Sequence, residues 1–262
     1  MEDGVYRRLL ECLRGLRAVS VAFSGGADSA LLLAAAREAL GDRVLALTAV
    51  TPYMVRQEIA DALALGAELG VRHQLVELPM PEGMGDNPPD RCYLCKRALF
   101  TRLIAVAEEQ GFAAVLDGSN VDDLTDYRPG LRALGELGVK SPFLECGIGQ
   151  EDVRRLALAL GLPTWRKPTN TCLLTRIPFG RKITMETLQR IEEAERLLLD
   201  RGYDWVRVRC HGDLARIEVA PGLRRRLLDE ADPIIEGMEG LGFRYVTLDL
   251  RGYQLGSMNA PG

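Results

Sequence analysis

Short apolar runs alternate with longer amphipathic stretches over the first half of the chain. Runs at 18–23, 44–50, 71–78 and 113–117 have the length and composition of buried strands. The stretches between them predict helices at about 3–16, from the glycines at 25 and 26 to 40, up to about 69, and at about 94–110. Such alternation is typical of a parallel sheet with helices on both faces, an α/β fold.

The second half of the chain has a different pattern. A long helix is predicted at about 184–201, and the strands "DWVRVRC" and "LARIEVA" have the spacing of a hairpin. A helix at about 222–238 and a last strand, "FRYVTLDL", complete a small α+β unit. The loop 161–180 contains three prolines, so we place a domain boundary near residue 170 and expect domains 1–170 and 171–262.

A glycine turn follows the first predicted strand. Its residues, "SGGADS" from Ser24 to Ser29, lack the Gly-Lys-Ser/Thr of a Walker A loop and the third glycine of a dinucleotide loop. The backbone N–H groups of Gly25 and Gly26 and the helix N-terminus can still bind an oxyanion. The hydroxyls of Ser24 and Ser29 can donate to phosphate, and Asp28 suits either a magnesium ion or a helix cap. The alternative to a phosphate-binding loop is an ordinary strand-to-helix turn with a capping residue.

A second polar turn, Asp117 to Asn120, follows the fourth predicted strand. Ligands of parallel α/β sheets bind at the carboxyl ends of strands, near the point where strand order reverses. The glycine turn and this second turn are therefore expected to form one site. The alternative for Asp117 is an ordinary turn residue before Gly118.

Composition narrows the class of protein. The net charge of −4 argues against a broad basic surface, so no nucleic-acid partner is expected. The start "MEDGVYRRLL" lacks a basic-then-apolar leader, and the apolar run from 30 to 36 is too short for a membrane span. We expect a cytoplasmic protein, in which six cysteines indicate metal-binding, catalytic or buried thiols rather than disulfides.

The positions of three cysteines indicate a chemical role. Cys92 and Cys95 form a CxxC motif, which can be a redox pair, and Cys172 lies in the proline-rich loop near Arg176, a cation that favours a thiolate. If the three converge, they suit a four-iron cluster with one open iron; alternatively, Cys172 donates its own sulfur. The remaining cysteines, Cys12, Cys146 and Cys210, have no motif and are interpreted as structural thiols.

Charged residues of the second half form another candidate group. Arg207 and Arg209 alternate with valines, so both point to one face of a strand. That face is either solvated or a paired guanidinium site for phosphate or carboxylate, which Arg176 can join. Glu195 stands in a run of acidic residues on a predicted helix, where such residues are usually exposed.

With these motifs in this order along the chain, the sequence resembles the LarE family of ATP-dependent sulfur transferases. The glycine turn in "VAFSGGADSALLL" resembles the PP-loop of the wider ATP pyrophosphatase superfamily. The more specific motifs are "NPPDRCYLCKRALF", "AAVLDGSNVDDLTDYRPG", "CLLTRIPFG", "VRVRCHGDLARIE" and "GFRYVTLDLRGYQLGSMN". Together they cover nearly the whole chain.

The resemblance implies an enzyme of nickel-pincer nucleotide biosynthesis. Such an enzyme adenylates a carboxylate of pyridinium-3,5-biscarboxylic acid mononucleotide, splitting ATP to AMP and pyrophosphate with Mg²⁺, and then replaces oxygen with sulfur. The implied ATP-binding residues are Ser24, Gly25, Gly26, Asp28, Ser29 and Asp117, with adenine near 48–50. The implied substrate-phosphate residues are Arg207 and Arg209, and the implied catalytic residues are Cys172, Asp28, Arg176 and Glu195.

The CxxC motif departs from the form of the family that sacrifices a single cysteine. The chain resembles the three-cysteine variant, in which Cys92, Cys95 and Cys172 would bind a [4Fe-4S] cluster that carries the transferable sulfide. Sacrifice of Cys172 itself remains the alternative. Family members assemble as homo-oligomers, trimers or hexamers. Rival functions are a tRNA-thiolating PP-loop enzyme, an amide-forming synthetase and a non-enzymatic ATP-binding sensor.

Overall fold

The computed structural model describes residues 3–125, 129–167 and 171–253. The chain divides into two compact units, which are residues 1–81 with 90–170 and residues 82–89 with 171–262. The segment 82–89 therefore belongs to the second unit, although it precedes the boundary predicted near residue 170. Buried Asn87 holds it there, because its side-chain amide donates to the carbonyls of Ile177 at 2.8 Å and Pro178 at 3.0 Å.

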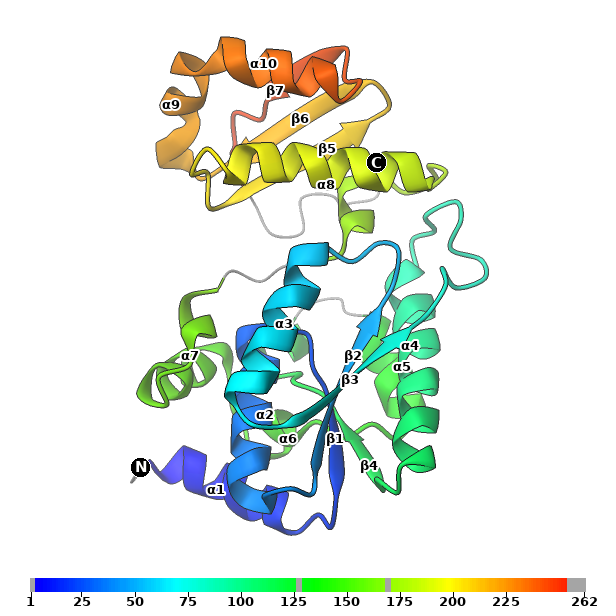
Figure 1. Cartoon of the computed structure of the whole chain (residues 1–262), viewed down its shortest axis with the longest axis vertical. Helices are drawn as coiled ribbons and strands as arrows, with labels where there is room; N and C mark the ends of the chain where they lie inside the picture. Colours follow the sequence, from blue (N-terminus) through cyan, green and yellow to red (C-terminus); the bar gives the residue numbers. More distant parts are fainter. Residues whose placement is uncertain (1–2, 126–128, 168–170, 254–262) are drawn as a thin grey trace. The chain divides into compact units, whose positions relative to one another are not determined.

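The first unit is built on a parallel four-stranded sheet of order β3-β2-β1-β4 (Figure 1). Its strands are β1 (Val19–Ala22), β2 (Val44–Val50), β3 (Arg72–Glu77) and β4 (Ala114–Leu116). All three pairings are parallel, as the alternating pattern of the sequence predicts. The predicted α/β fold with a parallel sheet is confirmed.

Helices cover both faces of this sheet. One face carries α1 (Gly4–Arg14), α2 (Ala27–Leu40), α3 (Arg56–Glu68), α6 (Pro142–Glu145) and α7 (Gln150–Ala159). The other face carries α4 (Arg91–Glu109) and α5 (Pro129–Glu136). Short 3₁₀ turns lie at η1 (Val121–Thr125) and η2 (Pro163–Arg166).

The alternation of side chains along each strand builds two hydrophobic cores. Val19 and Val21 of β1 pack into the core with α1 and α2, whereas Leu45 and Leu47 of β2 pack into the core with α4. Successive strand residues point to opposite faces, so a strand covered on both sides reads as a continuous apolar run. This explains why the buried strands are visible in the sequence.

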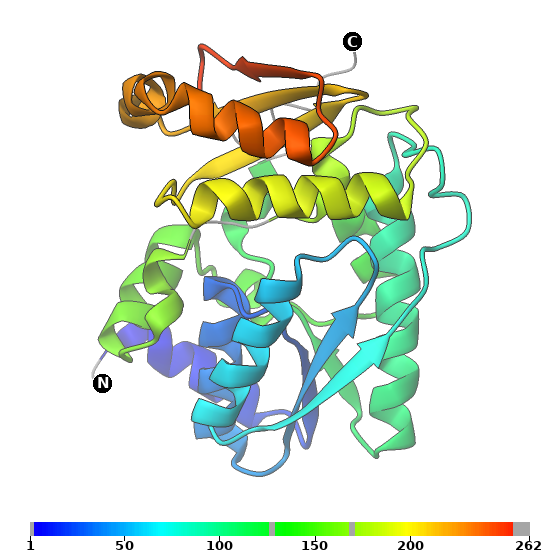
Figure 2. The same cartoon turned by 45° about the horizontal axis from the view of Figure 1, so that its top comes forward.

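The second unit holds a three-stranded sheet of order β5-β6-β7. Strands β5 (Val206–His211) and β6 (Leu214–Val219) pair antiparallel, and β7 (Tyr245–Leu248) pairs parallel to β6. Helix α8 (Met185–Leu199) packs against β5, and α10 (Ala231–Gly240) packs against α8 and β7 (Figure 2). The remaining elements are η3 (Leu173–Arg176), η4 (Pro221–Leu223) and α9 (Arg224–Asp229).

Two predicted helix boundaries are wrong. The single helix expected at about 222–238 is two helices, α9 and α10, which break at Glu230, where the backbone has φ −101° and ψ 21°. Pro233, in the first turn of α10, has no N–H to continue the ladder of α9. Helix α4 begins at Arg91 rather than near residue 94, because the carbonyl of Asp90 accepts from the N–H groups of Tyr93 and Leu94.

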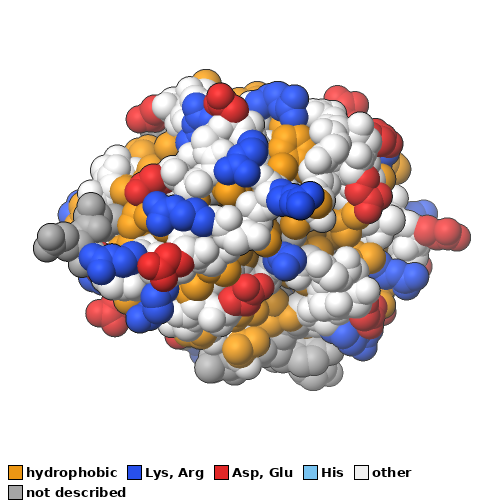
Figure 3. Space-filling view, turned by 90° about the horizontal axis from the view of Figure 1, so that it is seen from below, with side chains coloured by type: hydrophobic (Ala, Val, Ile, Leu, Met, Phe, Trp, Pro, Cys, Tyr) orange, Lys and Arg blue, Asp and Glu red, His pale blue; other side chains and the backbone are white. Residues whose placement is uncertain are grey.

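The surface shows no single dominant charge on the face drawn in Figure 3. There, lysine and arginine side chains lie among aspartate, glutamate and apolar side chains, a mixture typical of a hydrated protein surface. Within the described part of the chain, none of the helices combines the length and the apolar character that crossing a membrane requires.

Candidate active site

The strand order of the first unit reverses at β1, because β2 and β3 lie on one side of it and β4 lies on the other. Ligands of open α/β sheets bind at such a point, beyond the carboxyl ends of the strands. The glycine turn follows β1 there. Gly25 has φ +71°, and a Cβ atom built on it would lie 3.0 Å from Cβ of Ala62 in α3, so this position requires glycine.

Two serines hold the glycine turn in shape. The hydroxyl of Ser29 accepts from the N–H of Ser24 at 3.2 Å and contacts the Ser24 hydroxyl at 3.1 Å. The Ser24 hydroxyl also accepts from the N–H of Gly26 at 3.4 Å. Gly26 is the N-cap of α2, and Asp28 lies in the first turn of the helix, so Asp28 is not the N-cap residue.

The turns after β1 and β4 lie together, as predicted. The side-chain amide of Asn120 donates to Oδ1 of Asp28 at 2.8 Å. A Cβ atom on Gly118 would lie 3.1 Å from Cβ of Asp28, so the two turns pack closely. Asn120 belongs to the polar turn that the sequence predicts at this site, although no role of its own follows from the sequence.

Asp117 is buried and well bonded. Its Oδ1 accepts from the hydroxyl of Ser141 at 2.5 Å, and its Oδ2 accepts from the hydroxyl of Ser119 at 2.5 Å. The ammonium of Lys96 lies 3.8 Å from Oδ2. Two hydroxyl donors and a nearby cation compensate the burial of this carboxylate. Asp117 thus fixes the turn after β4 and brings Lys96 to the edge of the sheet.

The carboxyl end of β2, where the family resemblance puts adenine, carries two buried threonines. The hydroxyl of Thr48 donates to the carbonyl of Phe23 at 2.5 Å, and Nε2 of His73 lies 2.8 Å from the same hydroxyl. Thr51, one residue past the strand, has a buried hydroxyl oxygen with no hydrogen-bond partner in the described parts of the chain. The two hydroxyls at this end of β2 thus differ, since that of Thr48 is fully used and that of Thr51 is buried without a described partner.

The CxxC motif lies in the first two turns of α4. Cys92 is exposed and Cys95 is half-buried, and their three-residue spacing puts both thiols on one side of the helix. The hydroxyl of Tyr53, just past β2, lies 3.2 Å from Sγ of Cys95. The pair therefore borders the same edge of the sheet as the glycine turn. Among residues 3–125, 129–167 and 171–253, no group of three or more His, Cys, Asp or Glu side chains is placed to hold a metal ion.

The cysteines without a motif have structural surroundings. The thiol of Cys12 donates to Glu145 at 3.4 Å, and burial, together with neighbouring Cys146 and Glu145, raises the pKa of Cys12 to about 12. Burial also raises the pKa of Cys146. Cys210 is buried in β5 and accepts from the guanidinium of Arg190 at 3.3 Å. Thiols with raised pKa values are poor nucleophiles, which agrees with a structural interpretation of Cys12 and Cys146.

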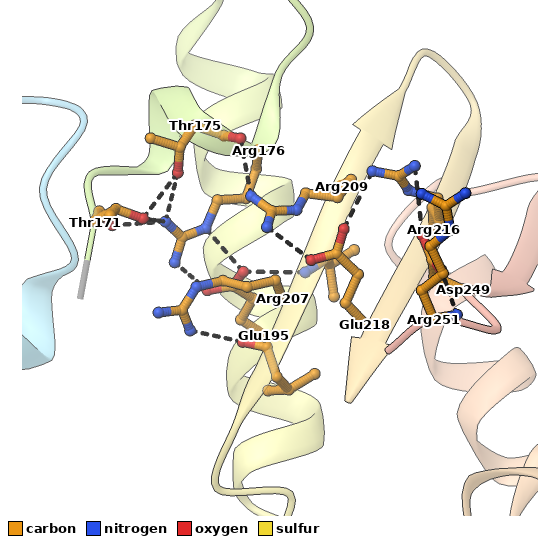
Figure 4. Close-up of polar contacts among 12 residues, drawn as sticks. Thr171, Thr175, Arg176, Glu195, Arg207, Arg209, Arg216, Glu218, Asp249 and Arg251 are labelled. Atoms are coloured by element: carbon orange, nitrogen blue, oxygen red, sulfur yellow. Dashed lines mark hydrogen bonds and ion pairs between the residues drawn. The ribbon is translucent and has the colours of Figure 1, made fainter. Parts of the chain in front are cut away.

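In the second unit, Arg207 and Arg209 of β5 are 7% and 3% exposed. The alternative of a solvated strand face is therefore wrong. Figure 4 shows both side chains directed toward the same group of polar residues from η3, α8 and β6. Arg209 donates to the carbonyl of Thr175 at 3.0 Å and to Glu218 at 2.7 Å, while the guanidinium of Arg207 lies over the ring of Tyr253.

Arg176 and Glu195 join this group through a two-point ion pair. Nε and Nη2 of Arg176 each donate to one carboxylate oxygen of Glu195, both at 2.9 Å. Burial would raise the pKa of Glu195, but the charge and hydrogen bonds of Arg176 outweigh it and hold that pKa below its usual value. The expectation that acidic residues of this helix are exposed is wrong for Glu195, because it faces β5 and also accepts from the N–H of Val208 at 3.0 Å.

The group as a whole carries an excess of positive charge. In the described chain it contains four guanidinium groups and three carboxylates: Arg176, Arg207, Arg209 and Arg216, with Glu195, Glu218 and Asp249. Burial, and then repulsion by Arg176, lower the pKa of Arg207. A bound anion would offset the repulsion among these guanidinium groups, so the group could hold a phosphate or a carboxylate.

Cys172 lies beside the same group. It is the N-cap of η3, and its carbonyl accepts from Nη1 of Arg176 at 3.0 Å. Arg176 therefore contacts the backbone next to the thiol while its other nitrogens bind Glu195. The sequence-predicted residues of the second unit, Cys172, Arg176, Glu195, Arg207 and Arg209, are thus brought together, as are those of the glycine and Asp117 turns in the first unit.

No protein-family model matches the chain. It is 39% identical to the pyridinium-3,5-bisthiocarboxylic acid mononucleotide synthase of Lactiplantibacillus plantarum, over 96% of this chain and 92% of that protein. It is 42% identical to the uncharacterized protein slr1717 of Synechocystis, over 91% of each chain. A shorter match, 30% identical over 56% of this chain and 51% of its relative, is to a component of the glutamine-hydrolyzing GMP synthase of Methanococcus maripaludis, which shares the PP-loop fold. The extent of the match to the mononucleotide synthase, together with the parallel sheet and its glycine turn, shows that the chain belongs to the LarE family of PP-loop enzymes.

Proposed function

We propose that this enzyme adenylates a carboxylate of pyridinium-3,5-biscarboxylic acid mononucleotide with ATP and replaces an oxygen of that carboxylate with sulfur. The observation that carries the proposal is the similarity to a pyridinium-3,5-bisthiocarboxylic acid mononucleotide synthase, which extends over more than nine-tenths of both chains. The product named there bears thiocarboxylates, so a sulfur-inserting step on a carboxylate is the reaction expected here.

Activation of the carboxylate is assigned to the first unit. The substrate oxygen attacks the α-phosphorus of ATP, the bond to the β-phosphate breaks, and pyrophosphate leaves. The backbone N–H groups of the glycine turn and the start of α2 would bind the phosphate oxygens. Asp28 is half-buried at this turn and offers a carboxylate oxygen, the ligand type that Mg²⁺ prefers, so it suits the metal that accompanies ATP.

Sulfur transfer then completes the exchange. A sulfur nucleophile attacks the activated acyl carbon, and AMP departs with one oxygen of the original carboxylate. The phosphate of the mononucleotide would bind the arginine group of the second unit, with Arg207 and Arg209 as its contacts. The net positive charge of that group and its burial support this assignment, because a desolvated anion site must compensate the charge of its ligand.

The source of sulfur is assigned to three cysteines. Cys92 and Cys95 offer two thiols on one side of a helix, and Cys172 would supply the third. Soft thiolates are the ligand type that a [4Fe-4S] cluster with one open iron would need. When bound, such a cluster supplies a transferable sulfide. Cys92 and Cys95 belong to the first unit and Cys172 belongs to the second. Cys172 would lie beside Arg176 and the arginine group.

Cysteine variants separate this assignment from sacrifice of Cys172. If the three thiols act together, Cys92→Ala, Cys95→Ala and Cys172→Ala should each lose iron binding and sulfur transfer in anaerobically prepared protein. Cys210→Ala, at a buried thiol outside the proposed set, is the control for effects of cysteine removal. Sulfur transfer by Cys92→Ala, combined with dehydroalanine at position 172 in the wild type after turnover, would instead establish Cys172 as the donor.

The reaction itself is tested by release of pyrophosphate. The proposal predicts that pyrophosphate appears only when ATP and the pyridinium dicarboxylate mononucleotide are both present. ATP binding without pyrophosphate release under these conditions would indicate a nucleotide sensor instead. Release that depends on tRNA, and not on the mononucleotide, would indicate a tRNA-thiolating enzyme.

A further inference from the structure

The ammonium of Lys167 lies against the glycine turn. Its Nζ atom lies 3.5 Å from the carbonyl oxygen of Gly25, 3.0 Å from Oδ2 of Asp61 and 3.3 Å from Oε2 of Glu58. The Lys167 side chain is 19% exposed. All four residues belong to the first unit, although Lys167 is more than a hundred positions from the other three in the sequence.

The position of Lys167 supplies a cation that the glycine turn itself lacks. The turn lacks the lysine that a Walker A loop carries at its end. Lys167 follows η2, which packs against α2 and α7, so a different part of the chain delivers an ammonium to the same place. The partner carboxylates project from α3, the helix that packs directly behind Gly25 through Ala62.

We propose that Lys167 binds the phosphates of ATP in this enzyme and takes the role of the lysine missing from the glycine turn. The inference rests on the ATP-dependent function proposed above and adds one residue to its nucleotide site. Asp61 and Glu58 hold the ammonium beside the turn. A nucleotide phosphate bound at the turn attracts Lys167 away from these carboxylates.

The chemistry of the partners permits this exchange. A lysine ammonium is a point charge on a flexible four-carbon stem, so it can turn from a carboxylate to a phosphate without moving the backbone. Asp61 keeps a hydrogen bond when Lys167 moves away, because its Oδ1 accepts from the side-chain amide of Gln57 at 2.8 Å. Asp61 is also 41% exposed, so water can solvate the oxygen that Lys167 releases.

The competing interpretation is a structural ion pair that ties Lys167 to α3. The two interpretations differ in what removal of Asp61 does. If the contact is only a tie, both variants weaken it: Lys167→Met removes the ion pairs with Asp61 and Glu58, and Asp61→Asn removes one of them. Both should then lower nucleotide affinity by loosening the turn. If Lys167 serves the nucleotide, Lys167→Met removes a phosphate ligand, whereas Asp61→Asn removes a competitor for it.

Calorimetric binding of α,β-methylene-ATP, which cannot be split at the α–β bond, tests the proposal on the full chain. We expect Lys167→Met to bind the analogue about 10- to 100-fold more weakly than the wild type, as expected for loss of a charge-assisted hydrogen bond. Asp61→Asn should bind it equally or more tightly, and adenosine affinity should be unchanged in both. Lys140→Met, which neutralises an exposed lysine of the same unit, is the control and should bind as the wild type does.

Two outcomes would overturn the inference. One is equal affinity of the wild type and Lys167→Met for the analogue. The other is a loss of affinity in both Lys167→Met and Asp61→Asn, which would leave only the structural tie. Failure of the proposed function is distinguishable, because the wild-type protein itself would then not bind the analogue. Thermal unfolding of each variant shows whether it is folded. If Lys167→Met is not folded, Lys167→Arg keeps the positive charge and is used in its place.

Discussion

Arg176 binds Glu195 at two points, with both nitrogen–oxygen distances at 2.9 Å, and both side chains are buried. The pair joins η3, which begins directly after Cys172, to α8, and Glu195 also accepts from the N–H of Val208 in β5. One carboxylate therefore positions the cysteine loop, a helix and the arginine strand within the second unit.

The first prediction concerns this pair. Glu195→Gln leaves the Arg176 guanidinium buried without its counter-charge, so we expect the free energy of unfolding to fall by about 3 to 5 kcal/mol. Chemical denaturation followed by circular dichroism measures this loss. Glu186→Gln, at an exposed glutamate in the first turn of the same helix, is the control and should have a far smaller effect. An equal loss in both variants would contradict the structural role of Glu195.

The second prediction concerns the glycine turn. Gly25→Ala introduces a Cβ atom at φ +71° and against Ala62, so the turn must shift and ATP affinity should fall at least about tenfold. Gly41 also has a positive φ, +62°, but faces open space at the end of α2. Gly41→Ala is therefore a control for backbone strain and should keep wild-type ATP affinity in calorimetry. A loss of affinity in Gly41→Ala alone would contradict the assignment.

A third prediction contrasts two glycines within helices. In Gly66→Ala of α3, the new Cβ atom would lie 2.7 Å from Nδ1 of His73, so crowding should outweigh the gain in helix propensity and destabilise the protein by about 1 to 2 kcal/mol. Gly135 of α5 has no atom within 4 Å of such a Cβ, and Gly135→Ala should stabilise the helix by up to about 1 kcal/mol. Thermal unfolding of the two variants should move in opposite directions.

The fourth prediction is a pH dependence of stability. Because Thr48 uses its hydroxyl hydrogen on Phe23, Nε2 of His73 donates to Thr48. Burial lowers the pKa of His73 below 6.5, its unfolded value. The unfolded chain then takes up a proton first as pH falls, so this stability is present above pH 6.5 and is lost as pH falls through the folded pKa.

Denaturation curves at about pH 8 and pH 5 measure this effect. The wild type should lose more stability over that interval than His73→Gln, which cannot take up the proton. His211 also has a lowered pKa, caused first by burial, and it remains in both proteins as an internal reference. An identical pH dependence of the two proteins would contradict a lowered pKa of the half-buried His73.

The fifth prediction concerns the mononucleotide. Arg207→Ala should weaken binding of the pyridinium mononucleotide by about tenfold or more, while ATP affinity stays the same. Arg225→Ala, at an exposed arginine of α9, is the matched control. Calorimetry with the two ligands separately gives both affinities. Unchanged mononucleotide binding by Arg207→Ala would return Arg207 to a purely structural role.

Local patterns predicted the first unit well. Buried strands appear as apolar runs because helices cover both faces of the sheet, and Gly25 and Gly26 mark the turn where β1 meets α2. Helix ends were less predictable. The start of α4 and the break at Glu230 depend on single backbone hydrogen bonds and on Pro233, which an averaged periodicity does not resolve.

Long-range contacts were not predictable from the sequence. Asn87 ties residues 82–89 to the second unit through carbonyls about ninety positions away, and no local pattern records those partners. The burial of Arg209 depends on Glu218 in the paired strand, and the approach of Lys167 to Gly25 depends on how η2 packs. Such contacts follow from tertiary packing, which one sequence read alone does not contain.

The mass of the mononucleotide after reaction with ATP tests the central claim most directly. Incubation of anaerobically prepared enzyme with ATP, Mg²⁺ and the pyridinium dicarboxylate mononucleotide should give a product heavier by the mass difference between sulfur and oxygen, with one pyrophosphate released for each sulfur inserted. An unchanged nucleotide mass in the presence of bound ATP and a full complement of iron would contradict the account.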